Sequence, residues 1–212
     1  DNLLSSDQTD PLLSLRPYWD NITHRDPFVL PTIPGKVETP HFSQPGSYFT
    51  DAFDLTLMVD DPNLEIYYTM DGSDPNPSHV GNPPSPYQVT YLYSDPIKVA
   101  NKSDGGNVYS EIRTTHVENN LRWAPPKGNV YKGQTVRAIA YSPRLDSSSP
   151  IITHTYFVDE DIHLRYPSLP VICLTADYEV LFEPETGILN TGLGNNPFYH
   201  LETRVPANLE LF

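Results

Sequence analysis

The chain has 212 residues, of which 27 are Asp or Glu and 13 are Lys or Arg, so its formal net charge is −14. This charge argues against nucleic acid as a partner, because binding to phosphate needs Lys and Arg, and also against anionic membrane surfaces. No run of apolar residues is long enough to predict membrane insertion. The charge fits a secreted or cell-surface protein that self-repulsion keeps soluble.

The first segment, residues 1–36, has a composition of its own. Short apolar patches, such as those around Leu3 and Leu12, alternate with Asp, Ser and several prolines. A segment of this kind is expected to be extended, and it needs other surfaces to become ordered. We therefore predict an extended N-terminal arm that packs on the body of the protein or on a neighbouring copy.

Short strands are predicted at regular spacing after residue 36. The 23 prolines exclude long helices and favour short strands joined by rigid loops. Phe53, Leu55, Leu57 and Val59 alternate with more polar residues, which is typical of a strand with one buried face. The predicted strands cover residues 37–42, 53–60, 64–70, 96–100, 109–115, 135–142 and 151–158. About seven short strands separated by turns predict an all-β fold, an immunoglobulin- or fibronectin-like β-sandwich.

The segment YYTMDGSDP, residues 67–75, predicts a strand that runs into a tight turn. Asp-Gly favours the turn, since Gly tolerates the positive φ that the turn needs, and the following Pro ends the strand. Asp71 and Asp74 can cap the turn through their own backbone, or they can be two ligands of a calcium ion. Two carboxylates are too few for calcium without help, so turn capping is the favoured interpretation and no cofactor is expected.

Aromatic side chains in two long loop regions are the main functional signal. We expect Tyr67, Tyr91, Tyr93 and Trp123 to form the set that could stack on sugar rings. The same residues can instead anchor a protein partner or belong to the core. The sequence leaves these three alternatives open. It contains no pattern of catalytic residues, and no catalytic residue is assigned.

Three segments together resemble the chitobiase/β-hexosaminidase C-terminal type of domain. They are YYTMDGSDP (67–75), SDPIKV (94–99) and TVRAIAY (135–141), so the resemblance covers roughly residues 38–158. It implies a fibronectin-like sandwich appended to secreted, extracellular or cell-surface bacterial proteins.

The C-terminal part resembles another family. VYSEIRT (108–114), LPVICLTAD (169–177) and RVPANLELF (204–212) are similar to the N-terminal part of CotH-like (spore coat protein H-like) proteins. In that family a sandwich precedes an atypical kinase-like domain. The resemblance implies that this chain stops before the nucleotide and metal residues of such a domain.

These observations predict an arm at 1–36, a sandwich at 37–160, and at 161–212 a linker with the opening of a CotH-like domain. The predicted function is a non-catalytic extracellular structural or interaction module. Its predicted partners are other protein chains, including further copies of itself held through the arm and the C-terminal strand. The alternatives are a carbohydrate-binding accessory module and the N-terminal portion of a CotH-like kinase.

Overall fold

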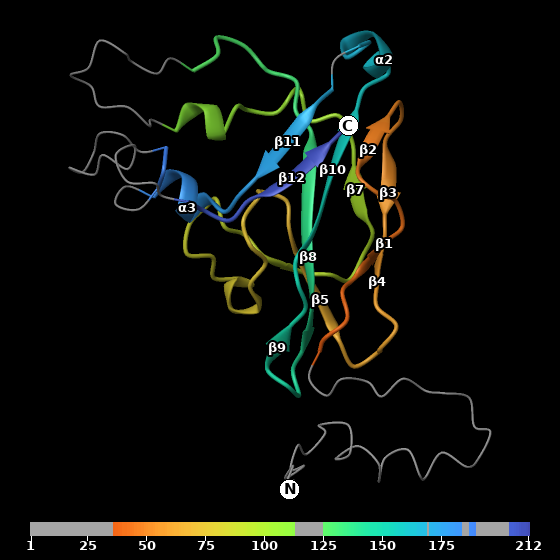
Figure 1. The fold of residues 1–212 in the computed structure, drawn as a ribbon, viewed down its shortest axis with the longest axis vertical. Helices are drawn as coiled ribbons and strands as arrows, with labels where there is room; N and C mark the ends of the chain where they lie inside the picture. Colours follow the sequence, from red (N-terminus) through yellow and green to blue (C-terminus); the bar gives the residue numbers. More distant parts are fainter. Residues whose placement is uncertain (1–35, 113–124, 169, 184–186, 190–203) are drawn as a thin grey trace, which may run out of the picture. The chain divides into compact units, whose positions relative to one another are not determined.

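A computed structural model describes residues 36–112, 125–168, 170–183, 187–189 and 204–212 (Figure 1). Nearly all of its regular elements are short strands, as the prolines and turn signals predict. The strands are β1 (His41–Phe42), β2 (Ser47–Phe49), β3 (Phe53–Leu55), β4 (Leu57–Met58), β5 (Glu65–Thr69), β6 (Tyr91–Leu92), β7 (Ile97–Val99), β8 (Gln134–Ser142), β9 (Ser147–Ser148), β10 (Ile152–Val158), β11 (Ile172–Thr175) and β12 (Asn208–Leu211). Two short helices, α2 (Ile162–Arg165) and α3 (Tyr178–Phe182), follow the sandwich strands.

One sheet forms the centre of the fold. Its strand order is β2-β10-β8-β5-β6, with β9 paired to β8. The β2–β10 pair is parallel and the other pairs are antiparallel. Two small ribbons, β1–β4 and β3–β7, supply the facing layer of the sandwich. The predicted all-β, fibronectin-like fold is confirmed.

The core lies between the central sheet and these two ribbons. Leu55 and Val99 are fully buried on the ribbon side, and Val136 and Tyr156 are fully buried on the sheet side. Because side chains alternate across a strand, the residues between Val136 and Ala140 that do not enter this core face the opposite side of the sheet. That second face carries Arg137 and Ile139.

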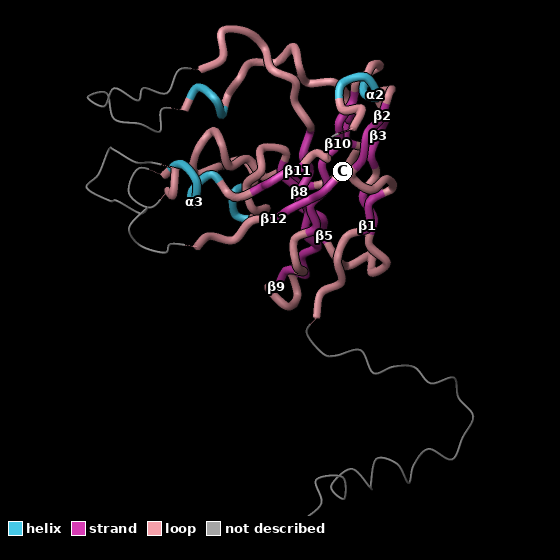
Figure 2. Tube along the Cα trace, turned by 45° about the horizontal axis from the view of Figure 1, so that its top comes forward, coloured by secondary structure: helices cyan, strands magenta, loops and turns pink. Residues whose placement is uncertain are grey.

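A two-stranded ribbon, β11–β12, lies over this second face (Figures 1 and 2). It approaches β10, whose Thr155 is hydrogen-bonded to Glu210 of β12. The helix α3 begins three residues after β11 ends, with Asp177 as its N-cap.

The strand predicted at residues 109–115 is wrong within the described part. Tyr109–Glu111 forms a 3-10 turn, and residues 113–115 lie outside the described residues. Asn107 organises this loop: its carbonyl accepts bonds from the backbone of Glu111 and from the Ser110 hydroxyl, while its side-chain amide donates to the Gly128 carbonyl. These local bonds compete with strand pairing. The single strand predicted at 53–60 is interrupted at Thr56, whose backbone bonds to Ser43 instead.

The three predicted domain boundaries stay predictions. The arm at residues 1–36 lies outside the described residues except for Lys36, which is exposed. Among the described residues, none of the helices is long and apolar enough to cross a membrane.

Candidate interaction site

The turn after β5 is held by the side chain of Asp71. One carboxylate oxygen, Oδ1, accepts bonds from the Ser73 amide (3.1 Å) and hydroxyl (2.5 Å), and Oδ2 accepts from the Val89 amide at 2.7 Å. Gly72 has φ 82°, the left-handed conformation that favours glycine at this position. Both oxygens of Asp71 are therefore engaged by protein donors.

The second carboxylate of this turn, Asp74, forms an ion pair with Arg137 on β8. Arg137 is buried, and its guanidinium also donates to the Gly72 carbonyl (2.7 Å) and to the Thr153 hydroxyl (3.3 Å). Across the described residues, no group of three or more His, Cys, Asp or Glu side chains is placed to hold a metal ion. The structure gives both aspartates turn and ion-pair contacts, and the calcium alternative stays a prediction.

The backbone of this turn also holds α3. The Asp74 amide donates to Asp177 Oδ2 at 2.7 Å, and the Gln88 side-chain amide donates to Asp177 Oδ1 at 3.1 Å. Asp177 is the N-cap of α3 and accepts from the Glu179 amide at 2.8 Å. A carboxylate that caps a helix and accepts three bonds is a firm link. The sequence motif of the sandwich thus positions the C-terminal helix.

The inner face of the β11–β12 ribbon is anchored by Glu210. Its Oε1 accepts from the Thr155 amide at 3.0 Å and its Oε2 from the Thr155 hydroxyl at 2.6 Å. The parallel pairing of β10 with β2 starts at Tyr156, so the Thr155 amide lies just beyond it. A side-chain carboxylate therefore satisfies a buried backbone donor that has no strand partner.

Glycine at position 46 makes room for this carboxylate. A Cβ at Gly46 would lie 2.8 Å from both Glu210 Oε1 and the Thr155 carbonyl oxygen. Burial by itself disfavours the charged form of Glu210, but the facing His154 and the Thr155 donors outweigh it and lower the pKa of this carboxyl. Phe212 completes the inner face by packing on the rings of Phe157 and Tyr48.

The outer face of the same ribbon is apolar and exposed. Ile172 is 63 % exposed, Leu174 67 %, Leu209 63 % and Leu211 66 %. The register pairs Ile172 with Leu211 and Leu174 with Leu209, so the four side chains form two adjacent cross-strand pairs on one face. Single exposed apolar residues are ordinary, but a contiguous group is typical of an interaction surface. We call this group the ribbon face.

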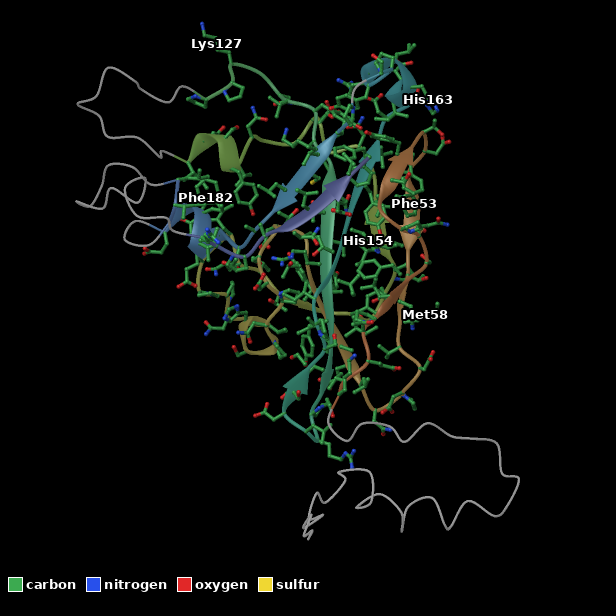
Figure 3. The ribbon with its side chains drawn as sticks, in the orientation of Figure 1. Phe53, Met58, Lys127, His154, His163 and Phe182 are labelled. Atoms are coloured by element: carbon green, nitrogen blue, oxygen red, sulfur yellow. The ribbon has the colours of Figure 1, made fainter. Side chains whose placement is uncertain are left out.

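A pocket of about 300 Å³ lies beside β11. Part of its lining comes from the ribbon and α3, and part from the loops of the sandwich: Met70, Asp71, Gly72, Tyr109, Thr135, Cys173, Leu174, Thr175, Ala176, Tyr178, Leu181 and Phe182. None of these residues belongs to β12, so the pocket is on the β11 side of the ribbon. Figure 3 shows Phe182 on α3, beyond the end of β11.

Three aromatic rings line this pocket, and a fourth, that of Tyr87, packs against two of them. Tyr87 stacks on Tyr178 with ring centroids 4.7 Å apart, and Tyr109 stacks on Phe182 at 6.1 Å. Tyr178 also contacts Phe182, and Tyr109 contacts Tyr87. The Tyr109 hydroxyl donates to the Asp71 carbonyl, and burial together with the nearby carboxylates raises its pKa. We call these four rings the aromatic cluster.

Three of the four aromatic residues predicted as a stacking set are described, and Tyr67 lies apart from Tyr91 and Tyr93. Tyr67 is only 9 % exposed and lies on the second face of the sheet, against Tyr141. Its hydroxyl donates to Glu65, and burial together with this bond raises the pKa of Tyr67 to about 12.

Tyr91 and Tyr93 lie on the core side of β5, around Tyr68. Tyr91 is 41 % exposed and stacks on Tyr68, whereas Tyr93 meets the same ring edge-on. Their rings therefore cannot lie in one plane. Trp123 lies outside the described residues.

The residues that the structure does bring together were not predicted from the sequence. Tyr178 and Phe182 are four residues apart on α3, and this spacing places them on one face. The alternation of Ile172 with Leu174, and of Leu209 with Leu211, was also visible. These signals indicate a ribbon with one apolar face. The packing of its other face on the sandwich depends on tertiary contacts, which the sequence pattern does not show.

Comparison with known proteins agrees with the fold. Residues 55–156, from the end of β3 to β10, match the family model described as Fn3 associated. No curated protein and no solved structure gives a significant match. The fold and the match together indicate a fibronectin-like sandwich. The CotH-like resemblance of the C-terminal part finds no support in the family match and stays a hypothesis.

Proposed function

We propose that this chain is a non-catalytic interaction module that binds another polypeptide on the ribbon face. The observation that carries the proposal is the pair of exposed cross-strand contacts, Ile172 with Leu211 and Leu174 with Leu209. The Fn3-associated match and the charge of −14 support an extracellular or cell-surface setting.

The size of the ribbon face indicates what a partner would gain. Burying a Leu or Ile side chain completely contributes about 1.5–3 kcal/mol, so covering four that are two-thirds exposed contributes roughly 4–8 kcal/mol. Association costs about 4–15 kcal/mol in lost freedom of motion. The ribbon face alone therefore supports weak binding at most, and a stable complex needs further contacts beside it.

Site-specific photo-crosslinking in the secreting cell tests the proposal. A photoreactive phenylalanine analogue replaces Leu174 or Leu209 in the full chain, and Leu145, exposed in the turn before β9, is the control position. We expect a discrete protein adduct from the two ribbon positions and none from the control. We also expect a Leu211→Asp substitution to abolish the adduct. No adduct, or one that forms equally from Leu145, would contradict the proposal.

The two alternatives have less support. The carbohydrate-binding alternative has less support because the sheet itself separates Tyr67 from Tyr91 and Tyr93. The kinase alternative rests on the CotH-like resemblance alone, and under it this module would be the non-catalytic front of an enzyme. Self-association through the ribbon is an outcome that the crosslinking experiment distinguishes, since the adduct would then have twice the mass of the chain.

A further inference from the structure

We propose that the free edge of β11 binds an extended segment of a partner protein as an added β-strand, with one aromatic side chain of that segment seated in the pocket beside it. The inference rests on the proposed function, because it specifies what kind of partner the ribbon accepts. It differs in naming the edge and the pocket, which the ribbon face alone does not require.

The hydrogen-bond pattern of the ribbon shows which backbone groups point outward. Val171 and Phe212 exchange both backbone bonds, at 3.0 and 2.9 Å, so they form a hydrogen-bonded pair. Pairs of this type alternate with non-hydrogen-bonded pairs, so the Ile172–Leu211 and Leu174–Leu209 pairs are non-hydrogen-bonded. The N–H and C=O groups of Ile172 and Leu174 therefore point away from β12.

Within the part of the chain that the structure describes, β11 pairs with β12 alone. The N–H and C=O groups of Ile172 and Leu174 that point away from β12 form the template that an added strand uses. An extended peptide backbone matches the spacing of these donors and acceptors, whereas the backbone groups of a helix are already bonded within it. The same two residues also present half of the ribbon face. A strand on this edge would therefore extend the apolar surface as well as the sheet.

The pocket provides a place for one anchoring side chain. It lies along the same edge, because Leu174, Thr175 and Ala176 line it, whereas β12 contributes no residue. Three rings of the aromatic cluster, Tyr109, Tyr178 and Phe182, line it, and Met70 and Leu181 add aliphatic surface. A volume of about 300 Å³ is at the lower limit of small-ligand pockets and fits a single large side chain. Aromatic residues are the usual anchors in such pockets, since they bury a large area with few rotatable bonds.

Charge decides against a second copy as the partner. The chain carries −14, and the elements that frame the pocket carry Glu111 in the 3-10 turn and Glu179 on α3. A second copy would bring the same negative charge to the interface. A segment with Lys or Arg beside its aromatic anchor would be electrostatically complementary. The partner segment is thus extended, apolar at alternate positions, aromatic at one and basic beside it.

The test selects binders to the full chain from a library of random 12-residue peptides. The Tyr178→Ala and Phe182→Ala variants of the full chain are then compared with it. We expect the enriched peptides to share one aromatic residue, alternating apolar positions and a basic neighbour. We expect each of the two substitutions to weaken the binding of a synthetic copy of one enriched peptide at least ~10-fold. Tyr91→Ala, which removes an exposed tyrosine elsewhere on the sandwich, is expected to change it less than ~2-fold, as is usual for a surface residue outside an interface.

N-methylation of the same synthetic peptide distinguishes strand addition from other modes of binding. Methyl groups on backbone nitrogens that face β11 should each weaken binding ~10-fold or more, while those at alternate positions are tolerated. Hydrogen exchange of the unmodified chain gives a second readout, because the Ile172 and Leu174 amides should exchange fast in the free chain and slowly in the complex.

Each result has a defined meaning. Absence of enriched peptides, N-methyl effects without alternation, or Ile172 and Leu174 amides already protected in the free chain would each overturn the inference. If crosslinking from Leu209 still identifies a partner under those results, the proposed function stands and only its strand-addition form fails. If neither experiment finds binding, the proposed function fails as well.

Discussion

Replacing Glu210 by Ala is expected to detach the ribbon from the sandwich without unfolding the core. The carboxylate accepts two bonds from Thr155, which is 1 % exposed, so the substitution leaves a buried amide without an acceptor. A hydrogen bond to a charged group contributes about 1.5–3 kcal/mol, and an unsatisfied buried donor costs about 1–3 kcal/mol. Allowing for partial entry of water, we expect docking of the ribbon to weaken by about 2–4 kcal/mol.

Native-state hydrogen exchange measures this effect locally. The Val171 and Phe212 amides bond across the ribbon and report its opening, while the fully buried Ala138 reports the core. Because 1.4 kcal/mol corresponds to a factor of ten, exchange of the two ribbon amides should accelerate roughly 30- to 700-fold. Asp60→Ala, which removes an exposed carboxylate far from the ribbon in sequence, is the matched control.

The pH dependence provides an independent check of the same contact. The pKa of Glu210 is lowered below its ordinary value of 4.5 in the folded chain. Its contribution is therefore fully present above pH 4.5 and is lost as the pH falls through the lower folded value. The ratio of ribbon to core exchange should rise only in that acidic range, and Glu210→Gln should flatten the rise. Wild-type protection of Val171 and Phe212 in Glu210→Ala would refute the reasoning.

Three further predictions concern the sandwich side. Gly46→Ala places a Cβ against backbone and should loosen the ribbon by about 1–3 kcal/mol, seen as faster exchange of its amides; Gly106→Ala, with open space around it, should not. Asp74→Ala leaves the buried Arg137 without its carboxylate and should cost about 2 kcal/mol, or roughly 4–8 °C in Tm; a change under ~1 °C would contradict the ion-pair argument. Excess Ca²⁺ and EDTA should give the same Tm, because both oxygens of Asp71 already accept protein donors; a rise of several degrees with Ca²⁺ would support the calcium alternative.

Much of the sandwich followed from local patterns in the sequence. The alternation around Val136 and the turn at Asp71 correctly predicted a strand and a hairpin end, because period-two burial and turn chemistry act over a few residues. The prediction failed at Tyr109, where the β-branched and aromatic residues of the segment favoured a strand. Asn107, which lies outside that segment, holds a 3-10 turn through bonds to its carbonyl, and its side chain bonds to a distant loop at Gly128.

The sequence by itself determined that this protein is an all-β, strongly acidic module with an Asp-Gly turn that marks a fibronectin-like sandwich. Only the tertiary structure decided where a partner can bind. Tyr67, which looked like a member of the stacking set, is buried on the opposite face of the sheet, whereas Tyr109 and Phe182 meet across more than seventy residues. Such contacts depend on how strands pair and layers pack, and that information is spread over the whole chain rather than held in any one segment.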